Sequence, residues 1–393
     1  MKLDYNFFVH KRNFYLLILI DRFLYLIFKI CAIFKIPKKN SCYEDRILLL
    51  EPAHLGDVLL TTPAIRYIKE ANPDKKIICL LSSAGAIALK KNNNISSIHI
   101  IDLPWYNNSG GILKSVFFFF KLIKALHDLK PKAVINFRTA SYHREHLAMW
   151  LSGVPERIGV SHKGFGFLLS KEIPYQNVEQ AALQKLKIIE KWLGERFDNH
   201  SIKIDYFINE TARESADKKF KNLKINQGKI IVGINPSAQH KFLWPQQYYI
   251  ALCKALYKDL NSEILFIGTS NFKNSVSSIQ KGLGFNTYSL VGETTLDEVS
   301  IIIQKLDMLI TEDTGIRYIS GVYNIPTYVL RNGANSSIEF GQHIETEKII
   351  VAEVPCSPCG KKNCPLGTLD CMVKITPELV FQTIRNDLPN HTK

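Results

Sequence analysis

One aspartate stands where a strand, a glycine and a helix are expected to meet. Asp57 follows Gly56 in a segment that begins with an apolar run, Ile47 to Leu50, and continues into a helix-like pattern. Consecutive apolar residues predict a parallel strand that is buried on both faces, and the glycine predicts a tight turn after it. The carboxyl ends of such strands border the ligand crevice of an open α/β sheet. A carboxylate there predicts a general base, and the alternative is a residue that only caps the helix.

A second polar group follows a later strand. The apolar run from Ala133 to Phe137 predicts that strand, and the loop after it contains Arg138 and Arg144 together with two histidines. Guanidinium groups bind phosphate through paired hydrogen bonds. The loop therefore predicts contacts to a phosphorylated acceptor, with a solvated surface loop as the alternative.

Two segments of the same kind lie in the second half of the chain. Ser237 and Lys241 follow a predicted strand among small residues that leave backbone N–H groups free, which favours binding of a diphosphate. Asp313, Thr314 and Gly315 follow another strand and open a helix, whose dipole favours a phosphate. Asp313 is also suited to hold sugar hydroxyls, and the alternative for this segment is helix capping. The sequence contains no Asp-x-Asp pair, so a metal-bridged diphosphate is not predicted.

Four cysteines cluster near the end of the chain, at Cys356, Cys359, Cys364 and Cys371. A Cys-x-x-Cys pair with two further thiols nearby predicts a structural zinc site, with a disulfide pair or free thiols as the alternatives. The other four cysteines are scattered, which is typical of a reducing compartment.

Strands and helices alternate in both halves of the chain, which predicts an α/β protein with two doubly wound parallel sheets. A polar, lysine-rich stretch separates the two series. We therefore expect an N-terminal membrane-associated segment (1–43), a first Rossmann-like domain (44–208), a linker helix region (209–228), a second Rossmann-like domain (229–350) and a C-terminal region with the cysteine cluster and a closing helix (351–393).

Composition narrows the class of partner. The 393 residues are 46% hydrophobic and 22% charged, which indicates a folded globular chain. The formal net charge of +14 favours an anionic partner, such as nucleic acid, a phosphorylated lipid or a nucleotide sugar. A zinc-containing nucleic-acid-binding protein is disfavoured, because the cysteine segment has three lysines and no aromatic residue for base stacking. No nucleic acid is expected as a partner.

The first residues of the chain are apolar but carry spaced charges. In a helical projection, Lys11, Arg22 and Lys29 fall on one narrow stripe of an otherwise apolar surface. This pattern predicts a helix that lies on the cytoplasmic membrane surface beside anionic lipid. A single-span anchor and a helix packed on the protein itself are the alternatives. In the predicted helix 111–129, the run Phe117 to Phe120 is apolar all round, so it is expected to face the core or a membrane.

With these motifs in place, the chain resembles glycosyltransferase family nine, the ADP-heptose:lipopolysaccharide heptosyltransferases, over about residues 46–388. The order and spacing of the matching pieces carry the resemblance more than any single piece. They are Leu55 to Ala64, Trp244-Pro245, Val291 to Leu296, Glu312 to Gly315, Cys371-Met372 and Ile375 to Glu378.

The resemblance implies a GT-B fold, in which two Rossmann-like domains face a cleft. The N-terminal domain is then expected to bind a glycolipid acceptor and the C-terminal domain a nucleotide-sugar donor such as ADP-heptose. It also implies inverting transfer that requires no metal or other cofactor, in the cytoplasm at the inner face of the membrane. Asp57 is then the catalytic base, and the remaining assignments are Asp313, Thr314, Gly315, Ser237, Lys241, Thr294 and Tyr318 for the donor and His54, Gly56, Arg138 and Arg144 for the acceptor.

Two positions depart from the family pattern. Tyr318 stands where many members carry a histidine, and Phe242 stands where they carry the diphosphate lysine, with Lys241 one residue earlier. These departures leave open a different sugar nucleotide or an inactive sugar-nucleotide binder.

Overall fold

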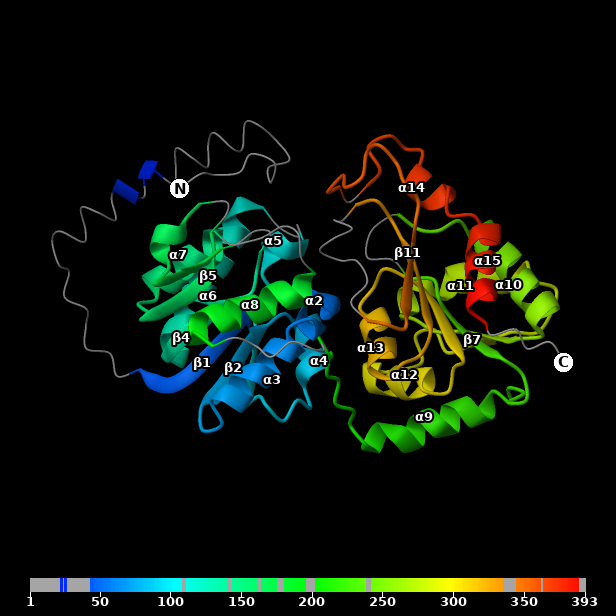
Figure 1. Ribbon diagram of the computed structural model, residues 1–393, viewed down its shortest axis with the longest axis horizontal. Helices are drawn as coiled ribbons and strands as arrows, with labels where there is room; N and C mark the ends of the chain where they lie inside the picture. Colours follow the sequence, from blue (N-terminus) through cyan, green and yellow to red (C-terminus); the bar gives the residue numbers. More distant parts are fainter. Residues whose placement is uncertain are drawn as a thin grey trace. The chain divides into compact units, whose positions relative to one another are not determined.

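The computed structural model divides into two compact units, residues 1–201 and 202–393 (Figure 1). Each unit contains a six-stranded parallel sheet, which confirms the predicted α/β class. The predicted domain limits within the chain stay predictions. The structure describes residues 22–23, 25–26, 43–107, 111–139, 143–161, 164–174, 180–195, 202–237, 242–334, 344–361 and 363–388.

The sheet of the first unit has the strand order β3-β2-β1-β4-β5-β6. Its centre is β1, which pairs with β2 on one edge and with β4 on the other. The apolar run of β1 is buried. The strands are β1 (Glu44–Glu51), β2 (Lys76–Leu81), β3 (Ser97–Ile100), β4 (Pro131–Asn136), β5 (Glu156–Val160) and β6 (Lys171–Ile173).

Helices connect these parallel strands, as a parallel sheet requires. Leu122, Leu126 and Met149, from two of these helices, pack on the even-numbered apolar residues of β1 and β2. The helices are α2 (Leu55–Leu59), α3 (Thr62–Ala71), α4 (Ser83–Leu89), α5 (Pro104–Asn107), α6 (Ile112–Leu129), α7 (His143–Leu151) and α8 (Ala181–Leu193), with a short 3₁₀ helix at Gly166–Leu168.

The second unit repeats the same winding, with the order β12-β11-β10-β7-β8-β9. Numbered from its own first strand, this order is identical to that of the first unit. In each sheet the strand order, and not the strand direction, reverses at one pair of neighbouring strands, called here the reversal point: β1 and β4 in the first unit, β7 and β10 in the second. The strands are β7 (Ile231–Asn235), β8 (Glu263–Phe266), β9 (Tyr288–Ser289), β10 (Met308–Glu312), β11 (Thr327–Arg331) and β12 (Glu347–Val351).

The helices of the second unit pack on its sheet and on one another. The expected linker helix is α9, which packs on α12. Lys219 of α9 pairs with Glu298 of α12 at 2.6 Å, and Asp217 of α9 pairs with Lys305, just beyond α12, at 2.8 Å. The helices are α9 (Thr211–Asn222), α10 (Gln246–Leu260), α11 (Lys273–Lys281), α12 (Leu296–Ile303), α13 (Ile316–Val322), α14 (Asp370–Val373) and α15 (Pro377–Asp387), with a 3₁₀ helix at Ser270–Phe272.

The N-terminal segment lies mostly outside the described residues, so the predicted charged stripe does too. Tyr25 is one of the few described residues of this segment and is helical. Its ring makes a T-shaped contact with the Phe167 ring, with 5.6 Å between the ring centroids. Within the described part of the chain, no helix has the length and apolar character needed to cross a membrane.

Candidate active site

Asp57 lies in the first turn of α2, directly beyond the carboxyl end of β1. Its Oδ2 accepts a hydrogen bond from the backbone N–H of His54 at 3.3 Å, so the capping role considered from the sequence is present. The side chain still exposes 22% of its surface, which leaves the carboxylate open to a substrate. Gly56 lies inside α2, so residues 52–54, and not this glycine, make the predicted turn.

Buried charges hold the backbone around Asp57. The Lys185 ammonium donates to Glu51 Oε2 at 2.7 Å and to the Asp57 carbonyl at 2.6 Å. The Arg138 guanidinium lies 3.5 Å from Glu51 Oε1 and 3.9 Å from Asp57 Oδ2. Glu51 is only 2% exposed and is paired with two cations, so it cannot serve as a base in place of Asp57. No local sequence pattern marks Lys185 or Glu51 as part of this site.

The two predicted acceptor arginines share an aromatic support. The Arg138 guanidinium lies 4.6 Å from the centre of the Tyr106 ring, and that of Arg144 lies 5.1 Å from the Trp105 ring. Both rings come from α5 and donate to Glu145 Oε1, Tyr106 through its hydroxyl at 2.6 Å and Trp105 through its indole N–H at 2.8 Å. Burial raises the pKa of Glu145. Arg144 is exposed, so its guanidinium can reach an anionic group of an acceptor.

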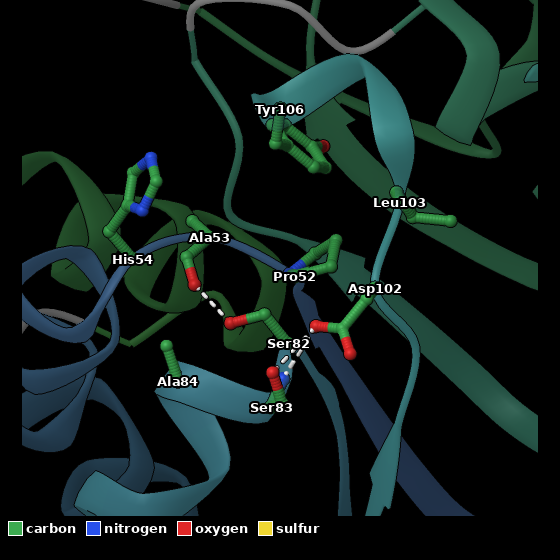
Figure 2. A pocket seen from close by; sticks show the side chains of 9 residues that line it. All are labelled: Pro52, Ala53, His54, Ser82, Ser83, Ala84, Asp102, Leu103 and Tyr106. Carbon is green, nitrogen blue, oxygen red and sulfur yellow. Dashed lines mark hydrogen bonds between the residues drawn. The ribbon is translucent and has the colours of Figure 1, made fainter. Parts of the chain in front are cut away.

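A small pocket of about 50 Å³ opens at the same edge of the sheet (Figure 2). His54 borders it on one side, and Asp102 and Tyr106 border it on another. Asp102 Oδ1 accepts from the backbone N–H and the hydroxyl of Ser83 at 2.8 and 3.0 Å, and the Ser82 hydroxyl donates to the Ala53 carbonyl. The lining is polar and suits a hydroxyl-sized group.

The corresponding edge of the second unit carries a hydroxyl-rich cluster. The Asn235 amide, at the end of β7, donates to the hydroxyls of Thr311 at 2.9 Å and Thr314 at 3.2 Å. The Ser237 hydroxyl is buried beside them and has no hydrogen-bond partner in the described structure. Gly268 has a φ of +145°, and a Cβ there would lie 2.9 Å from Ser237 Oγ and 3.0 Å from Asn235 Oδ1. A buried hydroxyl of this kind fits a ligand that supplies the missing hydrogen-bond partner.

Asp313 is held by two arginines. Its Oδ1 lies 2.7 Å from Arg317 Nη1, and its Oδ2 lies 3.5 Å from Arg331 Nε. Arg317 is fully buried and also makes a bidentate pair with Glu347, at 3.0 and 2.9 Å. Both Asp313 oxygens therefore already face a cation, which the sequence pattern did not predict for a residue expected to bind sugar hydroxyls.

Glu312, the residue before it, is a buried carboxyl with neutral donors. Its Oε1 accepts from the backbone N–H of Trp244 at 3.2 Å and from the Tyr249 hydroxyl at 2.9 Å, whereas Oε2 has no partner among the described residues. Burial raises the pKa of Glu312 to about 7. This carboxyl joins the end of β10 to the Trp-Pro turn before α10.

The other predicted donor residues differ in placement. Gly315 directly precedes α13, and Thr294 is half-buried just before α12. Tyr318 is buried, with the Arg317 guanidinium 4.8 Å from its ring centre, so its geometry favours a packing role over donor contact. Lys241 lies outside the described residues.

The four clustered cysteines are all described and all free. Cys356 is exposed and Cys371 is buried, and backbone N–H groups, first that of Leu369, lower the pKa of the Cys364 thiol. Across the described ranges, no three His, Cys, Asp or Glu side chains are grouped so as to hold a metal ion. The predicted zinc site therefore gains no support from the geometry.

The chain is similar to known glycosyltransferases. The sequence model of glycosyltransferase family 9 (heptosyltransferase) matches residues 148–369. The chain is 24% identical over 352 residues to lipooligosaccharide heptosyltransferase 2 of Campylobacter jejuni, covering 88% of this chain and 99% of that protein.

Two solved structures share the fold. A family 9 glycosyl transferase from Veillonella parvula has a TM-score of 0.70 at 19% identity, covering 88% of this chain and 98% of that one. The E. coli heptosyltransferase WaaC with ADP has a TM-score of 0.61 at 15% identity, covering 87% and 99%. The fold is thus the GT-B type expected from the sequence.

Proposed function

The chain belongs to glycosyltransferase family 9, the heptosyltransferase family, and from this premise we propose that it transfers a heptose from ADP-heptose to the core of a lipopolysaccharide or lipooligosaccharide. The carrying observation is the partly exposed Asp57 carboxylate at the carboxyl edge of the first sheet. The His54 backbone N–H donates to this carboxylate, and Lys185 holds the Asp57 backbone carbonyl. The relative from C. jejuni and the E. coli structure with ADP support the choice of acceptor and donor.

The proposed reaction is a single displacement. Asp57 removes the proton from the acceptor hydroxyl as that oxygen attacks the anomeric carbon of the donor. The new bond forms while the bond from the anomeric carbon to the diphosphate breaks, and ADP leaves with the electron pair. Attack from the face opposite the leaving group inverts the configuration. Asp57 is suited to this role because its carboxylate is partly exposed, whereas Glu51 is buried and paired.

The second unit supplies the site proposed for the donor. The Ser237 hydroxyl, which has no hydrogen-bond partner among the described residues, and the Thr314 hydroxyl lie just beyond the ends of β7 and β10. Gly268 lies next to Ser237, and its missing side chain leaves space there. Hydroxyl donors there can stabilise the charge of the departing diphosphate. This arrangement, together with the absence of an Asp-x-Asp pair from the sequence, supports a mechanism without a metal bridge.

Arg138 and Arg144 are proposed to position the acceptor. An exposed guanidinium supported by Trp105 can pair with a phosphate or carboxylate of a core sugar. The pocket beside His54 and Asp102 would then receive a hydroxyl of the same acceptor.

A donor screen with product analysis tests the proposal. The purified protein is incubated with a heptose-deficient lipopolysaccharide acceptor and with ADP-heptose, ADP-hexoses or UDP-hexoses in parallel. We expect the mass of one heptose to be added from ADP-heptose, the anomeric configuration to invert by NMR, and the rate to survive EDTA. Transfer from a different sugar nucleotide alone would assign another donor, and loss of activity in EDTA would contradict the metal-independent step.

A further inference from the structure

The first half of α6 presents large apolar side chains to solvent. Ile112 and Leu113 are 82% and 87% exposed, and Phe117 and Phe120 are 65% and 63% exposed. With Val116, which is also exposed, these residues form one continuous stripe at helical spacing, called here the α6 patch. Contiguous exposed apolar surface of this kind marks an interaction site.

Core packing does not account for the patch. The inward residues Phe118, Phe119 and Leu122 pack on the first unit through the rest of the helix's apolar surface. Beyond Phe120 the outward positions become polar, beginning with Lys121 and Lys124. One helix thus changes from an apolar to a charged outer face halfway along, whereas an ordinary surface helix is polar outward throughout.

The charges around the patch favour an anionic partner. Residues 111–127 contain Lys114, Lys121 and Lys124 but no Asp or Glu. The first acidic residue, Asp128, lies about two turns beyond Lys121 and pairs with Lys124 at 2.5 Å. Lysine stems can lie along an apolar surface while their ammonium groups reach lipid phosphates. Aromatic and aliphatic side chains flanked by lysines are the combination that binds a lipid interface.

The position of the patch links it to the acceptor site. α6 packs on α5, and α5 carries Tyr106, which lines the pocket and supports Arg138. From Leu113 to Phe120 the stripe spans about 10 Å along the helix axis, given the rise of an α-helix. A lipid surface that received this stripe would therefore lie beside the element that helps to form the acceptor site.

We propose that the α6 patch inserts into a lipid surface with anionic headgroups and docks the first unit on the membrane that contains the acceptor. The identity of the acceptor rests on the proposed function, but the docking itself can be measured without catalysis. The proposal places a membrane contact on α6, separate from the N-terminal segment of the chain.

A tryptophan at the patch reports insertion directly. The full chain carrying Phe117→Trp is mixed with vesicles of equal parts phosphatidylethanolamine and phosphatidylglycerol whose acyl chains are brominated. Leu366→Trp, at an exposed apolar position of the second unit, is the matched control. We expect lipid-dependent quenching of the added tryptophan at 117, beyond that of the wild type, and none at 366. Equal quenching of the two variants, or none at 117, would overturn the proposal.

A second set of variants tests the contribution to binding. Leu113, Phe117 and Phe120 are changed together to Gln, and the control changes the exposed residues Ile87, Leu366 and Leu379 to Gln. Co-sedimentation should show a vesicle partition coefficient reduced at least about tenfold for the patch variant, since three large apolar side chains no longer enter lipid. Both variants should keep the wild-type Tm and the wild-type rate on an acceptor without acyl chains.

Two results would contradict insertion of the α6 patch into lipid. If the patch variant kept full vesicle binding, the N-terminal segment alone would account for membrane association. If it instead changed a dimer into a monomer in sedimentation velocity without lipid quenching at 117, the occupant would be a second copy of the chain. If the wild-type chain transferred no sugar to any acceptor but still showed quenching at 117 and weaker vesicle binding in the patch variant, the proposed function would fail and the docking would stand.

Discussion

The two units have the same strand order, but different side chains stand at the point where that order reverses. At β1 and β4, the partly exposed carboxylate of Asp57 lies near a cation, and a small polar pocket lies at the same edge of the sheet. At β7 and β10, the nearest carboxylate, Asp313, is paired with two arginines, and the group that lacks a hydrogen-bond partner among the described residues is the Ser237 hydroxyl.

The difference follows from what surrounds each carboxylate. A general base must be accessible and able to take a proton. Asp313 is paired with buried Arg317, which also binds Glu347, so we expect Asp313 to keep the loop after β10 in place. We therefore propose that proton removal occurs at the first of these two positions and donor binding at the second.

The largest expected effect is on turnover in Asp57→Asn. The amide keeps the size of the side chain and much of its capping ability but cannot act as a base, so kcat should fall by about 10²–10⁴-fold. Initial rates on a soluble acceptor measure it. Asp102→Asn, which alters the carboxylate that lines the pocket, is the matched control and should keep kcat within about tenfold of the wild type. Equal losses in the two variants would remove the distinction between them.

Arg317→Met should mainly reduce stability. It removes the cation that pairs with the buried Glu347 carboxylate and leaves Asp313 with Arg331 alone, and breaking a buried pair costs about 3–5 kcal/mol of unfolding free energy. Arg213→Met, which removes an exposed pair with Glu210, should change the unfolding free energy far less, because solvent screens this pair. Denaturant unfolding compares them. A small loss for Arg317→Met would mean that the second reversal point does not depend on this pair.

Glu312 should make stability depend on pH. Its pKa in the folded chain is about 7 against an ordinary value of 4.5, so the folded state keeps this proton between about pH 4.5 and 7 and the unfolded state does not. Its contribution is complete below about pH 4.5 and is lost as the pH rises to about 7, by an amount on the order of 3 kcal/mol. Glu312→Gln should flatten this slope in unfolding measurements at pH 5 and pH 8, whereas Glu353→Gln at an exposed position should not. An unchanged slope in Glu312→Gln would show that another group titrates.

The smallest expected effect is on donor affinity in Ser237→Ala. Loss of one hydrogen bond of about 1 kcal/mol should raise the KM for ADP-heptose by about five- to tenfold. The Tm should not fall, because the hydroxyl has no partner in the described part of the free protein. Ser262→Ala, whose buried hydroxyl likewise lacks a described partner, should leave the KM unchanged. The same KM change in both variants would argue against a donor contact at Ser237.

Several features of the site could be predicted because they are local in sequence. A run such as Leu48 to Leu50 marks a buried strand, and the residue that follows it must lie at the carboxyl edge of the sheet. Asp57, Arg138 and Asp313 were identified in this way.

Other features depend on residues that meet only after folding. Lys185 binds the Asp57 carbonyl from 128 residues away, and no local pattern marks it. The pairing of Asp313 with Arg331, and the burial of Glu312, likewise depend on how β10, β11 and the Trp-Pro turn pack. The short strand β9, of two residues, is below the length at which periodicity is visible.

In α6, too, the sequence pattern alone does not show which side chains face the core. The apolar run Phe117 to Phe120 predicted either core or membrane, and the structure divides it, because 3.6 residues per turn place Phe118 and Phe119 inward and the other two outward.

Binding of ADP-heptose to the Asp57→Asn variant tests the division between the two reversal points most directly. Isothermal titration with the full chain measures the Kd in the absence of acceptor, so turnover does not enter the result. If Asp57 acts as a base on the acceptor and the donor is bound by the second unit, the variant should bind ADP-heptose with the Kd of the wild type while its kcat is lost. A variant that loses both donor binding and turnover would contradict the account, because Asp57 would then belong to the donor site.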